Sequence, residues 1–209
     1  MNNKTSSLLL ATVMAATLAA GLSACVPLVV GGAAVTAMVA VDRRTSGTQL
    51  EDEGIELRSA SRLREAFGDR AHINITSYNR QVLLTGEVPG EAAKQQAEQI
   101  VSRIDNVRSI VNELAPMQPT SLTQRSSDLL ITGKVKASLV DAKDLYVSAF
   151  KVVVERGTVY LLGRVTQREA DRATSIARQV NGVTRVVRVF EIISEEEMRR
   201  IQTQVSIGR

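Results

Sequence analysis

The segment QVLLTGEV, residues 81–88, returns in the same chain as TVYLLGRV, residues 158–165. Four positions coincide at one constant offset: Val82, Leu84, Gly86 and Val88 match Val159, Leu161, Gly163 and Val165. The apolar positions that follow also repeat, at an offset shorter by one, so a single deletion in the intervening loop restores the register. A period this long exceeds that of a solenoid unit, which needs its neighbours to complete a core. Each copy is therefore predicted to be a small domain.

The first copy predicts the element order helix, strand, strand, helix, strand. Apolar residues among charged ones indicate an amphipathic helix over about 50–67, ended by Gly68. Apolar and polar residues alternate over 73–76 and again over 82–88, which predicts two strands joined as a hairpin. A second helix over about 93–104 precedes a last strand from Val107. Because a helix separates them, the second and third strands are expected to pair in parallel.

The second copy repeats this order, so the fold class is α+β, with two tandem αββαβ modules. Its opening helix is expected to take Ser127 or Asp128 as its N-cap. Gly157 is expected to supply a left-handed residue in the hairpin turn. The first copy has Asn79 and Arg80 there, so the two turns are expected to differ in type.

The closing elements of the second copy are a helix predicted over 167–180 and a strand predicted over 183–193. A glycine inside a strand usually permits a bulge or a close approach of another segment. Gly86 and Gly163 are therefore interpreted as structural residues and not as parts of a site.

The N-terminus has the features of an export signal. An apolar run over 8–20 is followed by Leu22, Ser23, Ala24 and Cys25, which resembles the bacterial lipoprotein box. The resemblance implies cleavage before Cys25 and acylation of that residue, with palmitate among the attached chains. Val26, in place of an aspartate, implies transport to the outer membrane, on its periplasmic side. The alternative is an ordinary signal sequence followed by a free thiol. Cys25 is the sole cysteine, which rules out a disulfide within the chain.

Removal of residues 1–24 takes away one charged residue, Lys4, and lowers the net charge from +4 to +3. The remaining residues, 25–209, are enough for two small domains. Residues 26–41 are almost entirely apolar, yet the segment is shorter than the ~20 residues needed to cross a bilayer. Two interpretations stay open for this segment. It lies at the membrane beside the lipid anchor, or it is a flexible tether. The tether is expected to extend to residue 47, with a polar linker from Thr45 onward.

Taken together, the opening helix, the V-x-L-x-G-x-V hairpin, the alanine-rich helix and the closing strand resemble the BON domain, a module of periplasmic and osmotically induced bacterial proteins. Two in tandem behind a lipoprotein signal are similar to the dual BON-domain outer-membrane lipoproteins. The resemblance implies that the chain binds anionic phospholipid and supports envelope integrity, with the division site as one location. The expected domains span 48–115 and 120–193, with a linker over 116–119 and a tail over 194–209.

Residues typical of catalysis are sparse. His72 is the sole histidine, it directly precedes a predicted strand, and no nucleophile motif lies near it. Cysteine and histidine are too few for a usual zinc site, and no glycine-rich phosphate loop occurs. Glu51 and Glu53 are carboxylates on a predicted helix, where such pairs are ordinarily solvated. No catalytic residue, metal or cofactor is therefore expected, and the chain is not expected to be an enzyme.

The two modules differ in charge. The first carries 8 Lys or Arg against 11 Asp or Glu over 48–115, whereas the second carries 12 against 7 over 120–193. An anionic bilayer attracts each basic residue near its surface by about 1 kcal/mol, so the second module is expected to contact the membrane. An exported protein does not meet nucleic acid in its normal work, and aromatic residues that would stack on bases are few.

The opening helix of the second module is the candidate lipid-binding site. Its expected contact residues are Leu129, Leu130, Lys134, Lys136 and Arg125, the leucines inserting and the cations meeting phosphate. In the alternative interpretation, Leu129 and Leu130 complete an interdomain core and the lysines are solvated. A competing basic patch is formed by Arg168, Arg172 and Arg178.

Two functions of different classes are consistent with these features. The first is a lipid-binding lipoprotein of the envelope. The second is an adaptor that binds an envelope assembly or peptidoglycan protein and holds lipid only through Cys25. The short linker, with Pro116 and Pro119, predicts that the two modules touch. The protein partner and the oligomeric state are not predicted.

Overall fold

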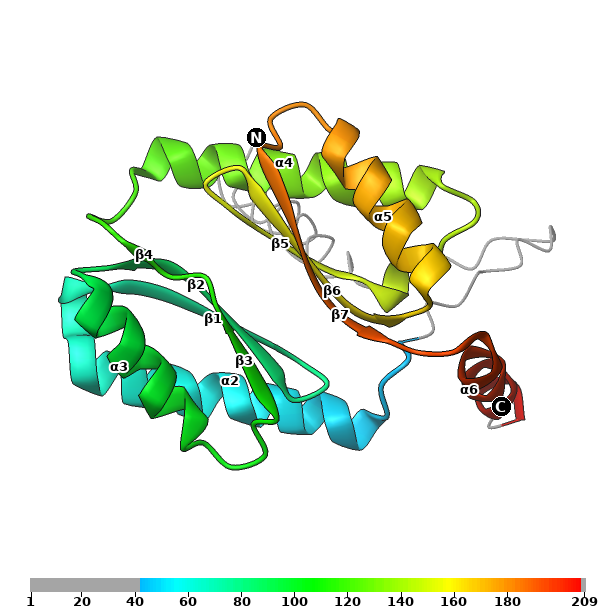
Figure 1. Cartoon of the computed structure of the whole chain (residues 1–209), viewed down its shortest axis with the longest axis horizontal. Coiled ribbons are helices and arrows are strands. Elements are labelled where there is room, and N and C mark those ends of the chain that lie inside the picture. Colours follow the sequence, from blue (N-terminus) through cyan, green and yellow to red (C-terminus); the bar gives the residue numbers. More distant parts are fainter. Residues whose placement is uncertain (1–41, 208–209) are drawn as a thin grey trace, which may run out of the picture. The chain divides into compact units, whose positions relative to one another are not determined.

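The computed structural model describes residues 42–207 (Figure 1). The predicted signal peptide, Cys25 and the apolar segment over 26–41 lie outside the described residues. Within residues 42–207 the helices lack the length and apolarity of a membrane-spanning segment.

The first module has the predicted order of elements. They are α2 (Ser46–Phe67), the short 3-10 helix η1 (Gly68–Arg70), β1 (His72–Tyr78), β2 (Gln81–Val88), α3 (Glu91–Ser102), β3 (Ser109–Asn112) and β4 (Ala115–Pro116). Strands β1 and β2 form an antiparallel hairpin, and β3 pairs with β2 in parallel after the α3 crossover. The short strand β4 continues the parallel pairing along the end of β2. The predicted hairpin and parallel pair are confirmed.

The second module repeats this arrangement. Its elements are α4 (Leu122–Asp141), the 3-10 helix η2 (Val147–Ala149), β5 (Lys151–Glu155), β6 (Thr158–Val165), α5 (Gln167–Gln179) and β7 (Arg185–Ile192), followed by α6 (Glu195–Ile207). Strand β6 is central, antiparallel to β5 and parallel to β7. The structure therefore confirms an α+β fold with two αββαβ modules.

Each module has a core between its helices and one face of its sheet. In the first module Ile55, Leu63, Val82, Leu84 and Val101 belong to this core. In the second, the core includes Ile131, Val135, Leu139, Val159 and Leu161. Figure 1 shows α2 and α3 beside the first sheet and α4 and α5 beside the second.

The opposite faces of the two sheets pack on each other. Tyr78 and Leu83 of the first module form one buried cluster with Tyr160, Leu162 and Val189 of the second. Strands β2 and β6 are therefore buried on both faces, which explains the consecutive apolar residues Val82 to Leu84 in β2 and Val159 to Leu162 in β6. The contact that the short linker predicts between the modules is present.

A buried aspartate joins the opening helix to the hairpin turn in each module. Asp52 accepts hydrogen bonds from the backbone N–H groups of Asn79 and Arg80, both at 2.8 Å. Asp128 accepts from the corresponding N–H groups of Arg156 and Gly157, at 2.8 and 2.9 Å. The two aspartates occupy equivalent positions of the repeat.

This contact corrects two expectations. Asp128 lies inside α4 and is not its cap, and neither is Ser127, because the helix begins at Leu122 with Ser121 as N-cap. The turns do not differ in type, since both central residues have positive φ in each: 52° and 67° at Asn79 and Arg80, 50° and 71° in the second turn. This is the pattern of a type I′ turn. The carboxylate that accepts both N–H groups stabilises it even where arginine occupies a left-handed position.

The glycines of the repeated segment have structural roles, as interpreted from the sequence. A Cβ at Gly86 would lie 2.0 Å from the carbonyl oxygen of His72, and one at Gly163 would lie 2.3 Å from that of Ala149. Both approaches are closer than any Cβ contact allows. Only glycine permits these backbone carbonyl groups to come this near.

The tether prediction extends too far into the folded part. Thr45 is the N-cap of α2, which begins at Ser46, so residues 45–47 are not a polar linker. Arg43 is buried and donates two hydrogen bonds of 2.7 Å to the carboxylate of Glu169 in α5. Arg44 donates to Asp52 of α2 at 2.8 Å and lies over the ring of Tyr78 at 4.2 Å. Residues 43 and 44 therefore join the segment that precedes α2 to both modules.

Candidate membrane-binding surface on α4

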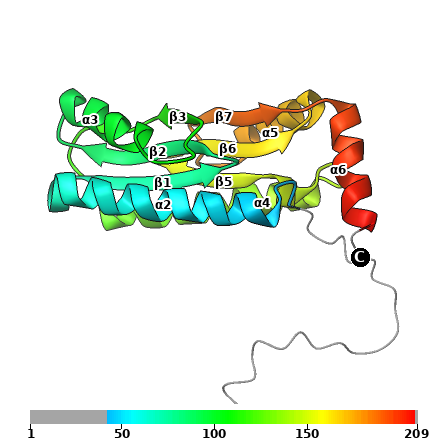
Figure 2. The same ribbon diagram turned by 90° about the horizontal axis from the view of Figure 1, so that it is seen from below.

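Helix α4 carries apolar residues on two opposite faces. One face packs on the second sheet through Ile131, Val135 and Leu139. The other is open to solvent and holds four large apolar side chains: Leu122, Leu129, Leu130 and Val140, which are 78%, 73%, 68% and 63% exposed. Figure 2 shows α4 running along β5, as α2 runs along β1. We call these four residues the α4 apolar stripe.

Leu129 and Leu130 do not complete an interdomain core. The cluster between the modules is made of strand residues, from β1, β2, β6 and β7. Because both leucines are largely exposed in the part of the chain that the structure describes, their side chains add little buried apolar area and so little stability to the fold. The part of the alternative interpretation that placed both leucines in an interdomain core is therefore wrong.

The first module shows that the stripe is not required by the fold. With Asp52 and Asp128 as equivalent positions, Leu129 and Leu130 correspond to Glu53 and Gly54 of α2. The same backbone thus folds with a charged residue and a glycine where the second module exposes two leucines. Helix α2 does expose two isolated leucines, at positions 50 and 57.

Cations flank the α4 apolar stripe. Lys134 and Lys136 are exposed, and within residues 42–207 neither has a carboxylate partner. In the competing patch, Arg172 is paired with Asp144 at 3.1 Å. The lysines of α4 therefore keep their full charge available to an anionic surface, whereas the competing patch loses part of its charge to a neighbour.

Arg125 differs from the other four candidates, all of which are exposed. Its side chain is partly buried and lines a cavity against Phe67, Ile73 and His72 of the first module. The structure thus brings Leu129, Leu130, Lys134 and Lys136 together on one exposed helix and places Arg125 at the contact between modules.

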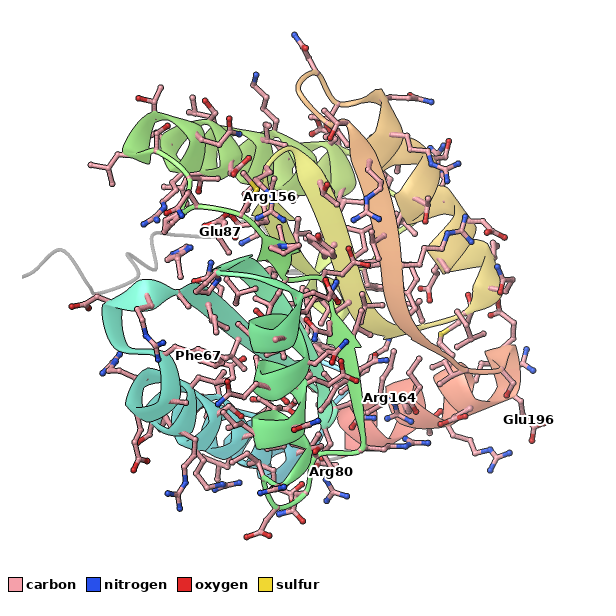
Figure 3. The ribbon with its side chains drawn as sticks, turned by 60° about the vertical axis from the view of Figure 1, so that its left-hand side comes forward. Phe67, Arg80, Glu87, Arg156, Arg164 and Glu196 are labelled. Atoms are coloured by element: carbon pink, nitrogen blue, oxygen red, sulfur yellow. The ribbon has the colours of Figure 1, made fainter. Side chains whose placement is uncertain are left out.

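Charged groups at this contact are held by specific partners. The carboxylate of Glu87 is fully buried and accepts from Arg156 at 2.7 Å and from the N–H of Thr120 at 3.3 Å (Figure 3). Burial opposes its ionisation, but these donors hold the pKa of Glu87 below its ordinary value. Asn79 is at the position equivalent to Arg156, and its side-chain amide donates a hydrogen bond to Glu191 of the second module. Further polar contacts between modules are Asn74 with Glu155 and Lys151 with Glu56.

Glu155 has the opposite behaviour. Burial raises the pKa of Glu155, its hydrogen bond from Asn74 counteracts part of the rise, and the charge of Glu87 adds to it. These groups have structural partners and do not converge on a substrate-sized site. In the part of the chain that the structure describes, no group of three or more His, Cys, Asp or Glu residues is placed to hold a metal ion.

The most informative residues that the sequence analysis missed are Asp52, Asp128 and the Arg43–Glu169 pair. The two aspartates carried a signal, since they fall at equivalent positions of the repeat, next to the candidate leucines of α4. The pairing of Arg43 with Glu169 carried none, because the two residues are 126 positions apart. Glu169 alone belongs to a local motif, the capping box with Thr166 at the start of α5, which does not point to Arg43.

Comparison with known proteins points to one family. The BON domain model matches residues 51–115 and 127–194. Outer membrane lipoprotein DolP of Haemophilus influenzae is 37% identical over 174 residues, which cover 82% of this chain and 90% of the relative. The 21 kDa hemolysin of Actinobacillus pleuropneumoniae is 34% identical over 155 residues, 73% of this chain and 80% of the relative. Osmotically-inducible protein Y of Escherichia coli is 31% identical over 118 residues, 54% of this chain and 58% of the relative.

Proposed function

Because the chain belongs to the BON-domain family, with two such domains in tandem, we propose that it is a non-enzymatic outer-membrane lipoprotein that binds anionic phospholipid through the α4 apolar stripe. Acylated Cys25 holds it on the periplasmic side of the outer membrane. The protein contributes to envelope integrity, and the division site is one place where it acts. The similarity to an outer membrane lipoprotein over most of both chains supports the location.

One observation supports the lipid contact above the others. At two equivalent positions, the acidic module has the exposed Glu53 and the half-buried Gly54, and the basic module has the exposed Leu129 and Leu130, while both modules keep the same fold. Leu129 and Leu130 have no role in the core, so their exposure is best explained by a partner that accepts apolar side chains. Lys134 and Lys136 beside them add attraction to an acidic surface.

The expected strength is modest. Full burial of a leucine contributes about 1.5 to 3 kcal/mol, and each lysine near an anionic surface contributes about 1 kcal/mol. Two of each give roughly 5 kcal/mol or more, from which the cost of immobilising the protein is subtracted. This suits a contact that reinforces a lipid anchor and orients the domains, since the anchor makes the second contact intramolecular.

Vesicle flotation tests the proposal. The fragment should start at residue 42 so that Arg43 and Arg44 keep their contacts, and it lacks Cys25. We expect flotation with vesicles containing phosphatidylglycerol, little with phosphatidylcholine alone, and weakening with added salt because exposed charges are screened. Leu129→Asp combined with Lys134→Glu should abolish flotation.

The chain supplies a matched control. Leu57 on α2 is exposed to the same extent as Leu129, 73% in each case, so Leu57→Asp removes an equal apolar surface from the other module. We expect this variant to float like the unmodified fragment. If the fragment does not float at all, the adaptor function becomes the better account. If it floats and both variants lose binding equally, the fragment binds lipid but α4 is not the lipid contact.

A further inference from the structure

A cavity lies between the two modules, apart from the α4 apolar stripe. It has a volume of about 410 Å³ and opens to solvent. The end of α2, strand β1, the interdomain linker and the first turns of α4 surround it. Its apolar lining includes Leu63, Phe67, Ile73 and Ile75. Both chemical components of an amphiphile site are present, because Arg64 and Arg125 line the same cavity.

The two guanidinium groups have no carboxylate partner among residues 42–207. The Nε atom of Arg125 is moreover buried and makes no hydrogen bond. A buried donor without an acceptor destabilises a protein by about 1 to 3 kcal/mol, so this atom gains from any ligand that brings an acceptor. The Oγ1 atom of Thr120, next to the lining residue Pro119, is buried and unpartnered as well.

The other titratable groups at the cavity leave its charge positive. Asp69 is the one carboxylate among the lining residues and opposes one of the two arginines. His72 also lines the cavity, and its Nδ1 lies 3.2 Å from the carboxylate of Glu87. That carboxylate is already neutralised by Arg156. With His72 neutral, the lining residues carry a net charge of +1.

The cavity depends on the tandem arrangement. Pro119 and Arg125 come from the linker and from α4, whereas the apolar lining comes from the first module. In the second module the positions equivalent to Arg64 and Phe67 are Val140 and Lys143, so that module could not offer the same surfaces. The duplicated sequence therefore explains the two modules, but it does not produce a second cavity with the same lining.

We propose that the cavity binds a single-chain amphiphile with an anionic headgroup. The acyl chain lies against Leu63, Phe67, Ile73 and Ile75, and the headgroup accepts charge-assisted hydrogen bonds from Arg64 and Arg125. The volume is at the lower end of the roughly 300 to 1,000 Å³ range of small-molecule sites, which fits one chain better than two. This site does not require that α4 contacts a membrane.

Calorimetric titration with soluble amphiphiles below their micelle concentration tests the proposal. The protein is the mature chain, residues 25–209, with Cys25→Ser so that no acyl chain is attached. Dodecanoate and dodecyl phosphate separate a carboxylate from a phosphate headgroup, and dodecyltrimethylammonium is the cationic counterpart. We expect saturable binding of at least one anionic probe at one site, with the cationic probe at least tenfold weaker. Equal binding of all three, or of none, would overturn the proposal.

Variants locate the site. Arg64→Gln combined with Arg125→Gln should weaken the anionic probe at least tenfold, and Ala60→Phe should reduce binding by filling the cavity. Arg172→Gln removes an exposed arginine elsewhere and should change nothing. If the arginine variant keeps its melting temperature and still binds as tightly as the original, the assignment is wrong. Leu130→Asp lies five residues from Arg125 on α4, on a different side of the helix, and should retain amphiphile binding, so loss of vesicle flotation and loss of this site are distinguishable.

Discussion

Replacement of Arg43 by alanine should destabilise the protein far more than its place before the first predicted element suggests. The Glu169 carboxylate that it pairs with is only 1% exposed, so Arg43→Ala leaves a buried charge without its main partner. Breaking a buried ion pair by removing one member costs about 3 to 5 kcal/mol. The backbone N–H of Thr166 still donates to Glu169 at 2.9 Å, which places the expected loss near the lower end of that range.

Urea unfolding of the fragment from residue 42 measures this loss. Arg62→Ala is the control, because Arg62 pairs with Glu65 at 3.5 Å with both side chains largely exposed, and such pairs contribute at most about 1 kcal/mol. A fragment that begins at residue 48 should show a loss similar to that of Arg43→Ala or larger. A loss in Arg43→Ala no greater than that of the control would refute the view that residues 43 and 44 are part of the fold.

Three further predictions concern the fold and its response to pH. Gly163→Ala should lower the free energy of unfolding by about 1 to 3 kcal/mol, because its Cβ would overlap the carbonyl oxygen of Ala149 in η2. Gly90→Ala meets nothing within 4 Å and should be nearly neutral, and equal urea midpoints would contradict this. Asp128→Ala leaves two turn N–H groups without their acceptor and should cost about 2 kcal/mol in the same assay, and an unchanged midpoint would show that the turn does not need the carboxylate. Acid should destabilise the protein, because hydrogen-bond donors hold the pKa of three carboxyl groups below its ordinary value in spite of burial. The unfolded chain therefore binds more protons below about pH 4.5, and stability is lost as the pH falls through the pKa values of the folded protein. A urea midpoint at pH 3.5 equal to that at pH 7 would refute this. The three residues are Asp52, Glu87 and Glu169. Glu155 acts in the opposite direction, because its raised pKa means that protonation relieves an unfavourable charge.

Local patterns in the sequence were sufficient for the order and pairing of the elements. The alternation in 82–88 and 159–165 and the repeat itself predicted both hairpins and both parallel crossovers. Apolar spacing alone places the start of α2 too late, because the helix begins at its Thr45 cap. The turn conformation was missed because it depends on a carboxylate distant in sequence, Asp52 for the N–H of Asn79.

The helix that carries the candidate site could be predicted from the sequence, but the positions of all its residues could not. Helix α4 has apolar residues on two faces. The row Ile131, Val135 and Leu139, at steps of four, indicates the buried face from the sequence, whereas the exposure of Leu129 and Leu130 depends on how the two modules pack. Lys134 could be placed beside Leu130, four residues before it, from helical spacing alone. Lys136 falls instead on the side of Leu129, seven residues before it. Arg125 could not be placed, since its position depends on how the first module packs beside the start of α4.

Single-tryptophan fluorescence tests the central claim most directly, because the chain contains no tryptophan of its own. We predict that the emission of Leu130→Trp shifts to the blue on addition of phosphatidylglycerol vesicles and is quenched by brominated acyl chains, while that of Leu57→Trp on α2 is unchanged. An unchanged spectrum for Leu130→Trp, or equal quenching at both positions, would contradict the assignment of α4 as the lipid contact.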